Sequence, residues 1–162
     1  MMNTPSFPSL LRNPVQLLAF GFGSGLAPHA PGTFGTLAAL PLYWLLIQGP
    51  WLFFAAFVLV ATLAGIYWCD RSARELGVHD HPGIVWDEIA GFLLTLLMVP
   101  TGWPWVLAAF LLFRLLDIWK PWPISWVDRR VGGGFGIMLD DVLAGLGAGV
   151  LLLAVDFLIS RL

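Results

Sequence analysis

Residues 51–69 read WLFFAAFVLVATLAGIYWC and contain no charged side chain. About 20 apolar residues are enough for a helix to cross the roughly 30 Å hydrocarbon core of a bilayer, so this stretch predicts a membrane-spanning helix. The composition of the 162-residue chain agrees, because 59% of its residues are hydrophobic and only 11% are charged. An ordinary soluble domain has about 25% charged residues. The nine tryptophans also fit, since Trp favours membrane interfaces.

Further charge-free runs surround this stretch and predict a bundle of helices. Asp, Glu, Lys and Arg are absent from residues 13–69, 89–113 and 142–155. Turn residues at Gly49-Pro50 and around 100–104 divide these runs. The predicted helices are Gly35–Gln48, Trp51–Cys69, Ile84–Val99, Trp103–Leu116 and Ile137–Ser160. We therefore expect an all-α fold, an integral membrane bundle of about five apolar helices arranged as two hairpins and a C-terminal helix.

The bundle is expected to form a single domain over residues 1–162, with a Pro-rich segment at 1–15 that is mobile or interfacial. The shortest predicted helices reach only about 21 Å, less than the hydrocarbon core. Such helices are expected to tilt, to extend beyond these limits, or to end at a thinned or wet site. The first residues lack the basic, apolar and small-residue order of a signal peptide, so none is expected.

The charged residues fall on one side of this bundle. When the chain is threaded with its N-terminus inside, the basic residues Arg71, Arg74, Arg114, Lys120, Arg129 and Arg130 lie on the same side as Arg12. That side is cytoplasmic by the positive-inside rule. Most acidic residues lie there too, as does the loop 21–36, GFGSGLAPHAPGTFGT. The sequence therefore predicts one charged face, toward the cytoplasm, and one bare face.

Two pairs of adjacent acids enter apolar helices on the charged face. Asp87-Glu88 is expected in the first turn or two of its helix, and Asp140-Asp141 in the first turn of the last helix. Acids at a helix N-terminus are favoured by the helix dipole, but carboxylates in membrane helices are expensive and point to function. Four converging carboxylates would repel one another unless a cation lies between them. Oxygen ligands of this kind suit Mg²⁺.

The spacing of the other charged residues does not decide between a functional and a structural role. Arg114, Asp117 and Lys120 share one face of a helix end by their spacing, and a functional and a structural role are equally open for them. Asp70/Arg74 and Arg71/Glu75 have the spacing of ordinary surface ion pairs. The segment His79-Asp80-His81 is expected to be a polar loop rather than a metal cluster, because paired histidines alone are weak evidence for ligation.

Several function classes are excluded by the sequence. A net charge of −2 does not favour nucleic-acid binding. The single cysteine forms no intrachain disulfide, zinc site or CxxC pair. The chain has no Cys-x5-Arg loop, no DxDx[TV] sequence and no GxxxxGK[ST] loop, so it lacks the signatures of cysteine-based phosphatases, aspartyl-phosphate enzymes and P-loop proteins.

Three long segments together resemble the phosphatidylglycerophosphatase A family. They read GFGSGLAPHAPGTFGTLAALP, GVHDHPGIVWDEIAG and FRLLDIWKPWPISWVDRRVGGGFGIMLDDVLAG, and the resemblance extends from about Leu17 to Ala148. It implies an all-helical, Mg²⁺-dependent lipid phosphatase of the bacterial inner membrane. Such an enzyme removes the terminal phosphate of phosphatidylglycerophosphate to give phosphatidylglycerol in phospholipid biosynthesis. The motif positions in this chain are Asp80, Asp87, Glu88, Arg114, Asp117, Lys120, Asp140, Asp141 and the loop Gly23–Thr36.

With this resemblance, each position receives an expected role. We expect Asp87, Glu88, Asp140 and Asp141 to hold one or two Mg²⁺ ions at the cytoplasmic interface. Asp80 or Asp117 would orient or deprotonate a water, and Arg114 and Lys120 would offset phosphate charge. Backbone N–H groups of the 21–36 loop would contact phosphate or glycerol oxygens, and the residues expected to bind substrate there are Gly23, Ser24, Gly32, Thr33 and Thr36.

Two other classes stay open at this point. A small ion-coupled transporter would also use intramembrane acids, but it would place them near the midplane and show inverted repeats. The acids here lie at helix ends on one side, and no repeat is evident. A structural membrane subunit would need no acid cluster at all.

Overall fold

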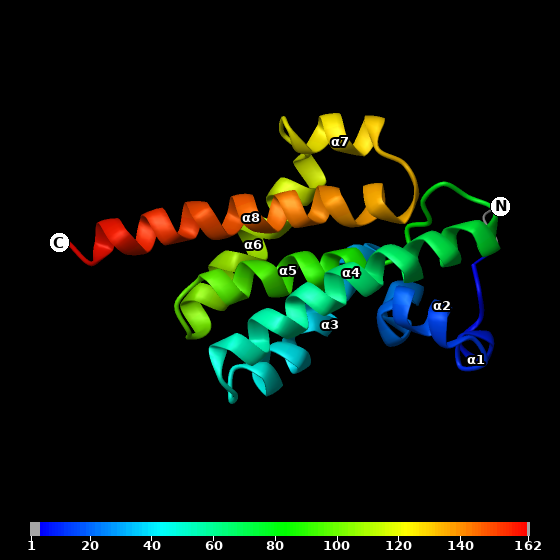
Figure 1. Cartoon of the computed structure of the whole chain (residues 1–162), viewed down its shortest axis with the longest axis horizontal. Helices are drawn as coiled ribbons and strands as arrows, with labels where there is room; N and C mark the ends of the chain where they lie inside the picture. The colour runs from blue at the N-terminus through cyan, green and yellow to red at the C-terminus, as the bar shows by residue number, and fades with distance from the viewer. Residues whose placement is uncertain (1–3, 162) are drawn as a thin grey trace.

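The computed structural model describes residues 4–161, and this part of the chain contains helices and no strands (Figure 1). The helices in chain order are α1 (Phe7–Leu10), α2 (Pro14–Ala19), the 3₁₀ helix η1 (Gly21–Leu26), α3 (Pro31–Leu46), α4 (Trp51–Leu76), α5 (Trp86–Met98), α6 (Trp103–Trp119), α7 (Ile124–Arg130) and α8 (Gly133–Ile159). The predicted all-α class is confirmed. Helices lie at all five predicted apolar segments, and four short helices accompany them.

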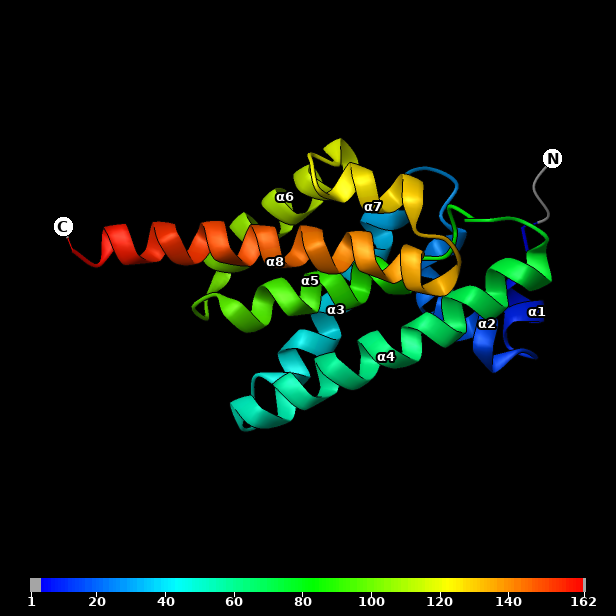
Figure 2. The ribbon, with the colours of Figure 1, turned by 45° about the horizontal axis from the view of Figure 1, so that its top comes forward.

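Both expected short turns are present, and α5 lies at the centre of the bundle. The turn at 99–102 joins α5 to α6, and these two helices pack together as the expected hairpin. The turn at 47–50 joins α3 to α4, but α3 packs on α5 rather than along α4, so the first expected hairpin is not a packed pair. Both views place these turns toward the end where α8 finishes, with the N-terminus at the opposite end (Figures 1 and 2). α5 packs against α3, α4, α6 and α8, and most of its residues are buried. The chain therefore has a charged end, where α5 and α8 begin, and an opposite end whose charged residues are Asp156 and Arg161 near the end of α8.

Small residues allow α5 and α8 to approach backbone to backbone. A side chain at Gly145 of α8 would overlap the Gly91 carbonyl of α5, and one at Gly91 would overlap the Asp141 carbonyl. The Thr95 hydroxyl lies 3.1 Å from the carbonyl oxygens of both glycines. This contact fixes which face of α8 meets α5 near the acidic residues.

The start of α8 differs from the prediction. α8 begins at Gly133, so Asp140 and Asp141 lie in its third turn, and their expected place in the first turn is wrong. The glycine run does not interrupt the helix because it packs directly on α4: a side chain at Gly134 would overlap the Ile66 carbonyl. The Gly134 N–H also donates to Asp70 Oδ1 at 3.2 Å, which supplies a partner for the helix N-terminus.

Two helices are long and apolar enough to cross a bilayer. α4 and α8 meet this test by length and hydropathy, and each is about 40 Å long at 1.5 Å per residue. Large apolar side chains cover the outward face of α4, among them Leu52, Phe53, Leu59 and Leu63. Apolar surfaces of this extent belong against lipid or a partner rather than water. α3, α5 and α6 are shorter, from about 20 to 26 Å.

The N-terminal segment packs on the charged end of α4. Asn13 caps α2, since its Oδ1 accepts the Gln16 N–H, and both side chains donate to Glu75 Oε2 at 2.8 and 3.1 Å. Leu10 is fully buried. The prediction that residues 1–15 are mobile or interfacial falls in part on residues 1–3, outside the described residues. For the rest of the segment it stays a prediction.

Candidate active site

A polar cavity of about 120 Å³ lies at the charged end, where α5 and α8 begin and α6 ends. It is lined by the loop before α5 and by these three helices, through Asp80, His81, Pro82, Ile84, Asp87, Glu88, Asp117, Lys120, Ile137, Asp140 and Asp141. Residues up to 61 positions apart in sequence thus line one space. Every ionisable residue predicted for the site lines it except Arg114, which lies beside it.

Three of these acids form a close group. One carboxylate oxygen from each of Asp87, Glu88 and Asp141 lies within 4.8 Å of the other two. Asp87 and Asp141 are buried, and the Glu88 side chain is 14% exposed. Among residues 4–161, Asp87 Oδ1, Glu88 Oε2 and Asp141 Oδ1 are buried without a hydrogen-bond partner. A buried carboxylate oxygen without a partner is unfavourable, so this group has acceptor capacity that the described residues do not fill.

The three-acid group fits Mg²⁺. The free oxygens supply the hard ligands that this cation prefers, and Mg²⁺ in proteins is commonly held by a few carboxylates together with a substrate phosphate. A cation would also relieve the repulsion between carboxylates at this distance. The donor chemistry and the orphaned oxygens therefore both favour a divalent cation here.

Asp140 lies outside this group and is paired with Lys120 through Oδ2, while its Oδ1 is buried without a partner among the described residues. Lys120 Nζ donates to Asp140 Oδ2 at 2.6 Å and also to Asp128. The four acids predicted as metal ligands thus divide into three neighbours and one residue on the Lys120 side. Burial alone would lower the pKa of Lys120, but its ion pairs with Asp128 and Asp140 outweigh burial and raise the pKa above its ordinary value. Lys120 is therefore positively charged at neutral pH.

Arg114 connects the acids of α5 and α6. Its Nη1 lies 2.5 Å from Asp117 Oδ2, one turn along the same helix, and 3.7 Å from Glu88 Oε1. Its side chain is only 14% exposed, and its Nε is buried without a partner among the described residues. This ion pair confirms the predicted common face for Arg114 and Asp117. Lys120, predicted on the same face, instead follows the end of α6 in a left-handed backbone conformation and pairs with Asp128 and Asp140. The Nε–H donor of Arg114 is not used by the described residues.

The start of α3 reaches the site through two small residues. A side chain at Gly32 would overlap Glu88 Oε1 and approach the Arg114 guanidinium. Thr36 is fully buried, and its hydroxyl donates to the Gly32 carbonyl at 2.9 Å and lies 3.5 Å from Arg114 Nη1. Gly32 and Thr36 are thus the predicted loop residues that the structure brings next to the charged groups.

The other three predicted loop residues lie elsewhere. Gly23 packs against Phe7 of α1. The Ser24 hydroxyl is buried beside Gly21 and has no partner among the described residues. Thr33 is half-buried in the first turn of α3, whose N-cap residue Ala30 makes no side-chain cap. Ser24 and Thr33 therefore do not cap α3, and substrate contact by Gly23, Ser24 and Thr33 stays a prediction.

The loop between α4 and α5 lines one part of the cavity with Asp80, His81 and Pro82. His81 Nδ1 accepts the Gly83 N–H at 3.0 Å, which places the proton of a neutral ring on Nε2. Burial lowers the pKa of His81, with an opposing effect of Asp80. Burial raises the pKa of Asp80, while Lys120 opposes that rise. His81 thus holds the turn and is not in the three-acid group.

Asp128 is an ionisable residue beside the site that was not predicted there, as is His81, which lines the cavity. Asp128 lies on α7, a short helix that was not predicted, and like Asp140 it pairs with Lys120 Nζ. The only sequence feature that could have indicated Asp128 is its position in the charged cluster between Arg114 and Arg130. The turn that brings it back toward Lys120 has no counterpart in the hydropathy pattern.

Comparisons with known proteins show which family the chain resembles. A family model described as phosphatidylglycerophosphatase A matches residues 17–156. A phosphatidylglycerophosphatase A from Escherichia coli is 52% identical over 143 residues, which cover 87% of this chain and 83% of the relative. One from Haemophilus influenzae is 45% identical over 157 residues, with 96% of each chain covered.

A third relative, from Bacteroides thetaiotaomicron, is described as a candidate phosphatidylinositol-3-phosphatase. It is 39% identical over 167 residues, covering 98% of this chain and all of the relative. No solved structure matches the chain. The family match covers all the residues of the polar cavity. The chain belongs to the phosphatidylglycerophosphatase A family.

Proposed function

We propose that this protein hydrolyses the terminal phosphate monoester of phosphatidylglycerophosphate and releases phosphatidylglycerol. The observation that carries the proposal is the buried three-acid group Asp87, Glu88 and Asp141, with its unpartnered oxygens, beside two cations at one end of an apolar bundle. The named relatives supply the substrate. With a divalent cation held by the three acids, Arg114 and Lys120 would be placed to bind the oxygens of a phosphate monoester.

Asp87, Glu88 and Asp141 would hold Mg²⁺. When bound, Mg²⁺ would offset the charge that the phosphate brings among carboxylates and would activate a water for attack on phosphorus. Asp140 uses Oδ2 to bind Lys120 at 2.6 Å, so it would hold that lysine in place, while its Oδ1 has no partner among the described residues. The Mg²⁺ ligand set proposed from the structure is therefore smaller than the four acids expected from the sequence.

Arg114 and Lys120 would bind the phosphate oxygens from two sides. Arg114 presents a planar set of donors suited to two oxygens at once. Lys120 keeps its charge because two acids hold it. Asp117 is bound to Arg114 at 2.5 Å, so it would orient that guanidinium, whereas Asp80 is the better candidate to orient or deprotonate the attacking water.

The bundle would lie in the bacterial inner membrane with its charged end toward the cytoplasm. Exposed tryptophans occur at both ends: Trp51 and Trp103 at the end where α8 finishes, and Trp119, Trp122 and Trp126 at the charged end. Trp is typical of the two membrane interfaces. All five longer helices would then be embedded, and the phosphate site would lie near the headgroup level while the acyl chains stay among apolar surfaces.

An ion-coupled transporter is not favoured, because the acids gather at one end of the bundle rather than at its middle. A second phosphate-bearing lipid deserves a direct comparison, since one relative is described by phosphatidylinositol 3-phosphate. Both substrates present a phosphate monoester on a lipid headgroup, and they differ in the size of the group that carries it.

Phosphate release by the purified protein in detergent micelles tests the proposal. Phosphatidylglycerophosphate and phosphatidylinositol 3-phosphate are supplied in parallel, each with Mg²⁺, with a chelator, and with Mg²⁺ restored. We expect release from phosphatidylglycerophosphate that stops with the chelator and returns with Mg²⁺. No release by folded protein would refute the activity, and undiminished release in chelator would refute the metal. Faster release from phosphatidylinositol 3-phosphate would reassign the substrate.

A further inference from the structure

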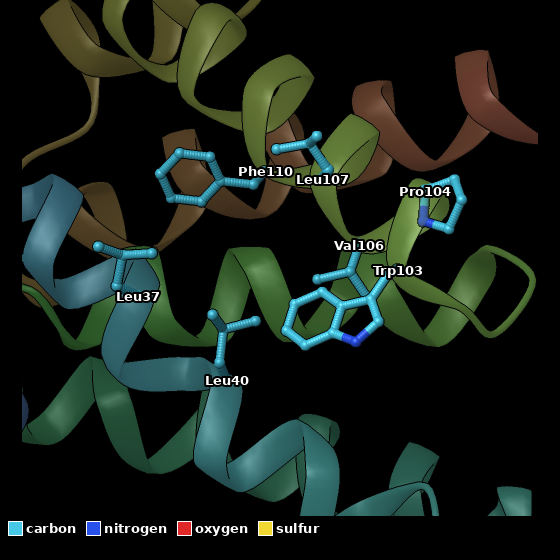
Figure 3. Close-up of a pocket in the computed structure, with 7 residues that line it drawn as sticks. All are labelled: Leu37, Leu40, Trp103, Pro104, Val106, Leu107 and Phe110. Carbon is cyan, nitrogen blue, oxygen red and sulfur yellow. The ribbon is translucent and has the colours of Figure 1, made fainter.

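An apolar cavity of about 570 Å³ lies between α3 and α6, and none of its lining residues is polar. Figure 3 labels the seven lining residues: Leu37 and Leu40 from α3 face Trp103 and Phe110 from α6. We call this space the α3/α6 groove. Its volume is within the range of ligand sites and several times that of the polar cavity. It is open along one side, because Leu37 and Leu107 at its edges are 41% and 58% exposed.

One end of the groove adjoins the candidate active site. Leu37 follows Thr36 directly, and Phe110 lies one helical turn before Arg114, about 5.4 Å along the axis. Arg114 Nη1 and Thr36 Oγ1 lie 3.5 Å apart, so these two side chains join α3 and α6 at this end. A molecule in the groove would therefore have a cationic group immediately above it.

The other end of the groove lies beside a pair of tryptophans. The rings of Trp44 on α3 and Trp103 on α6 are 5.2 Å apart, centroid to centroid. From Trp103 to Phe110 the groove runs along about two turns of α6, and Arg114 lies about one turn further along. Its two ends are thus unlike: one is cationic and polar, and the other is aromatic and apolar.

We propose that the α3/α6 groove holds one acyl chain of the phospholipid substrate while the phosphate lies at Arg114 and the three-acid group. This inference rests on the proposed function. An amphiphile with an anionic head and a hydrocarbon tail matches both ends of the groove at once. A polar or charged partner segment would find no hydrogen-bonding group along the walls.

The groove would act by positioning rather than by attraction. A chain that leaves the bilayer for an apolar groove exchanges one apolar environment for another, so little hydrophobic free energy is gained. What changes is the depth and the direction of the headgroup, and correct placement of a reacting group has large effects on rate. The groove is therefore expected to affect kcat/KM for acylated substrate and to matter much less for a headgroup without chains.

The test fills the groove and compares two substrates. Leu40→Trp adds bulk to the groove wall, and Leu59→Trp makes the same exchange on the outward face of α4, where Leu59 is exposed. Each variant and the wild type are assayed with dipalmitoyl phosphatidylglycerophosphate and with its water-soluble deacylated form. We expect Leu40→Trp to reduce kcat/KM for the dipalmitoyl substrate at least tenfold more than for the deacylated one, and Leu59→Trp to show no such selectivity.

Equal effects of Leu40→Trp on both substrates, or no effect, would overturn the groove assignment while leaving the phosphatase activity in place. Failure of the wild type to use the dipalmitoyl substrate would instead remove the proposed function and this inference together.

A second experiment uses the wild-type protein and so does not depend on the folding of a variant. A phosphatidylglycerophosphate analogue with a photoreactive group in one acyl chain should label peptides containing residues 37–40 or 103–110, and labelling confined to the outer faces of α4 and α8 would indicate surrounding lipid only and overturn the assignment.

Discussion

Acids occur beside basic residues in two neighbouring regions of this protein, and the two regions differ in what is left unsatisfied. At the end of α4, Arg74 bonds Asp70 and Arg71 bonds Glu75, each at 2.7 Å. Asp70 also accepts the Gly134 N–H, and Glu75 accepts from Asn13 and Gln16. These acids have partners within the chain, and their basic partners are mostly exposed to solvent.

At the start of α5, by contrast, the acids are buried and incompletely paired. Asp87, Glu88 and Asp141 each keep an oxygen without a partner among the described residues, although Arg114 lies 3.7 Å from Glu88. The number of acids is similar in the two regions. What distinguishes a candidate site is buried acceptor capacity that the chain itself does not fill, and that difference can be tested by substitution.

The largest expected effect follows from removing one carboxylate of the three-acid group. Asp141→Asn and Asp87→Asn should each lower phosphatase activity on the order of 100-fold or more, because loss of partners even outside the direct ligands costs about 10- to 100-fold in metal sites. The residual activity should require more Mg²⁺. The measurement is kcat/KM in detergent at graded Mg²⁺ concentrations, with Asp70→Asn as the matched control on α4. Full activity of both variants at ordinary Mg²⁺ would exclude these residues as ligands.

The next effect concerns stability in the presence of Mg²⁺. A ligand that binds only the folded state adds about 2.7 kcal/mol when present at 100 times its Kd, so Mg²⁺ should raise the unfolding temperature of the wild type. The Asp87→Asn variant should respond much less. In chelator the same variant should be more stable than wild type, since one of three mutually repelling carboxylates has been neutralised. Thermal unfolding followed by tryptophan fluorescence measures both differences, and an identical Mg²⁺ response of the two proteins would contradict the assignment.

Much of this architecture could be predicted from the sequence, because charge-free runs determine where apolar helices lie and spacing within a helix determines which residues share a face. The Arg114–Asp117 pair is an example. The separation of Asp141 from Asp140 could not be predicted. Adjacent residues on a helix point about 100° apart, and the contact that selects between them, Gly91 against the Asp141 backbone, joins two helices.

The 21–36 segment shows the same limit. Its position on the charged face was predictable, but only Gly32 and Thr36 reach Arg114. Gly25 instead packs against the Gly83 carbonyl, supporting the loop that precedes α5. Tertiary contacts decide that Gly32 lies beside the charged groups and that Gly25 packs on backbone, and composition does not encode these contacts.

A third prediction uses this distinction. Gly32→Ala would place a methyl group against Glu88 Oε1, the far end of a flexible side chain, so the fold can adjust but the carboxylate must move. Displacements of about 1 Å at a reacting site can lower rates by about 10²-fold, and we expect a loss of roughly 10- to 100-fold with a small change in unfolding temperature. Gly49→Ala, in an open turn, is the matched control. A large loss of stability with unchanged activity per folded molecule would contradict this account.

Lys120→Ala should have a smaller effect on activity. It removes one of two cations facing the phosphate and leaves Asp128 and Asp140 without their shared partner. We expect KM to rise on the order of tenfold with the helices intact, and Lys120→Arg to restore most of the affinity because it restores the charge. Steady-state kinetics and circular dichroism of both variants provide the check, and unchanged kinetics of Lys120→Ala would remove this residue from the site.

The smallest effect is expected in the other region of the comparison. Arg71→Ala breaks the ion pair with Glu75, but Glu75 retains Asn13 and Gln16 as donors. Exposed ion pairs of this spacing contribute about 0.5 kcal/mol or less, so the unfolding temperature, kcat/KM and Mg²⁺ requirement should stay near wild type. A rise in the Mg²⁺ requirement of Arg71→Ala would mean that the end of α4 communicates with the three-acid group, and the two regions would then have to be treated as one site.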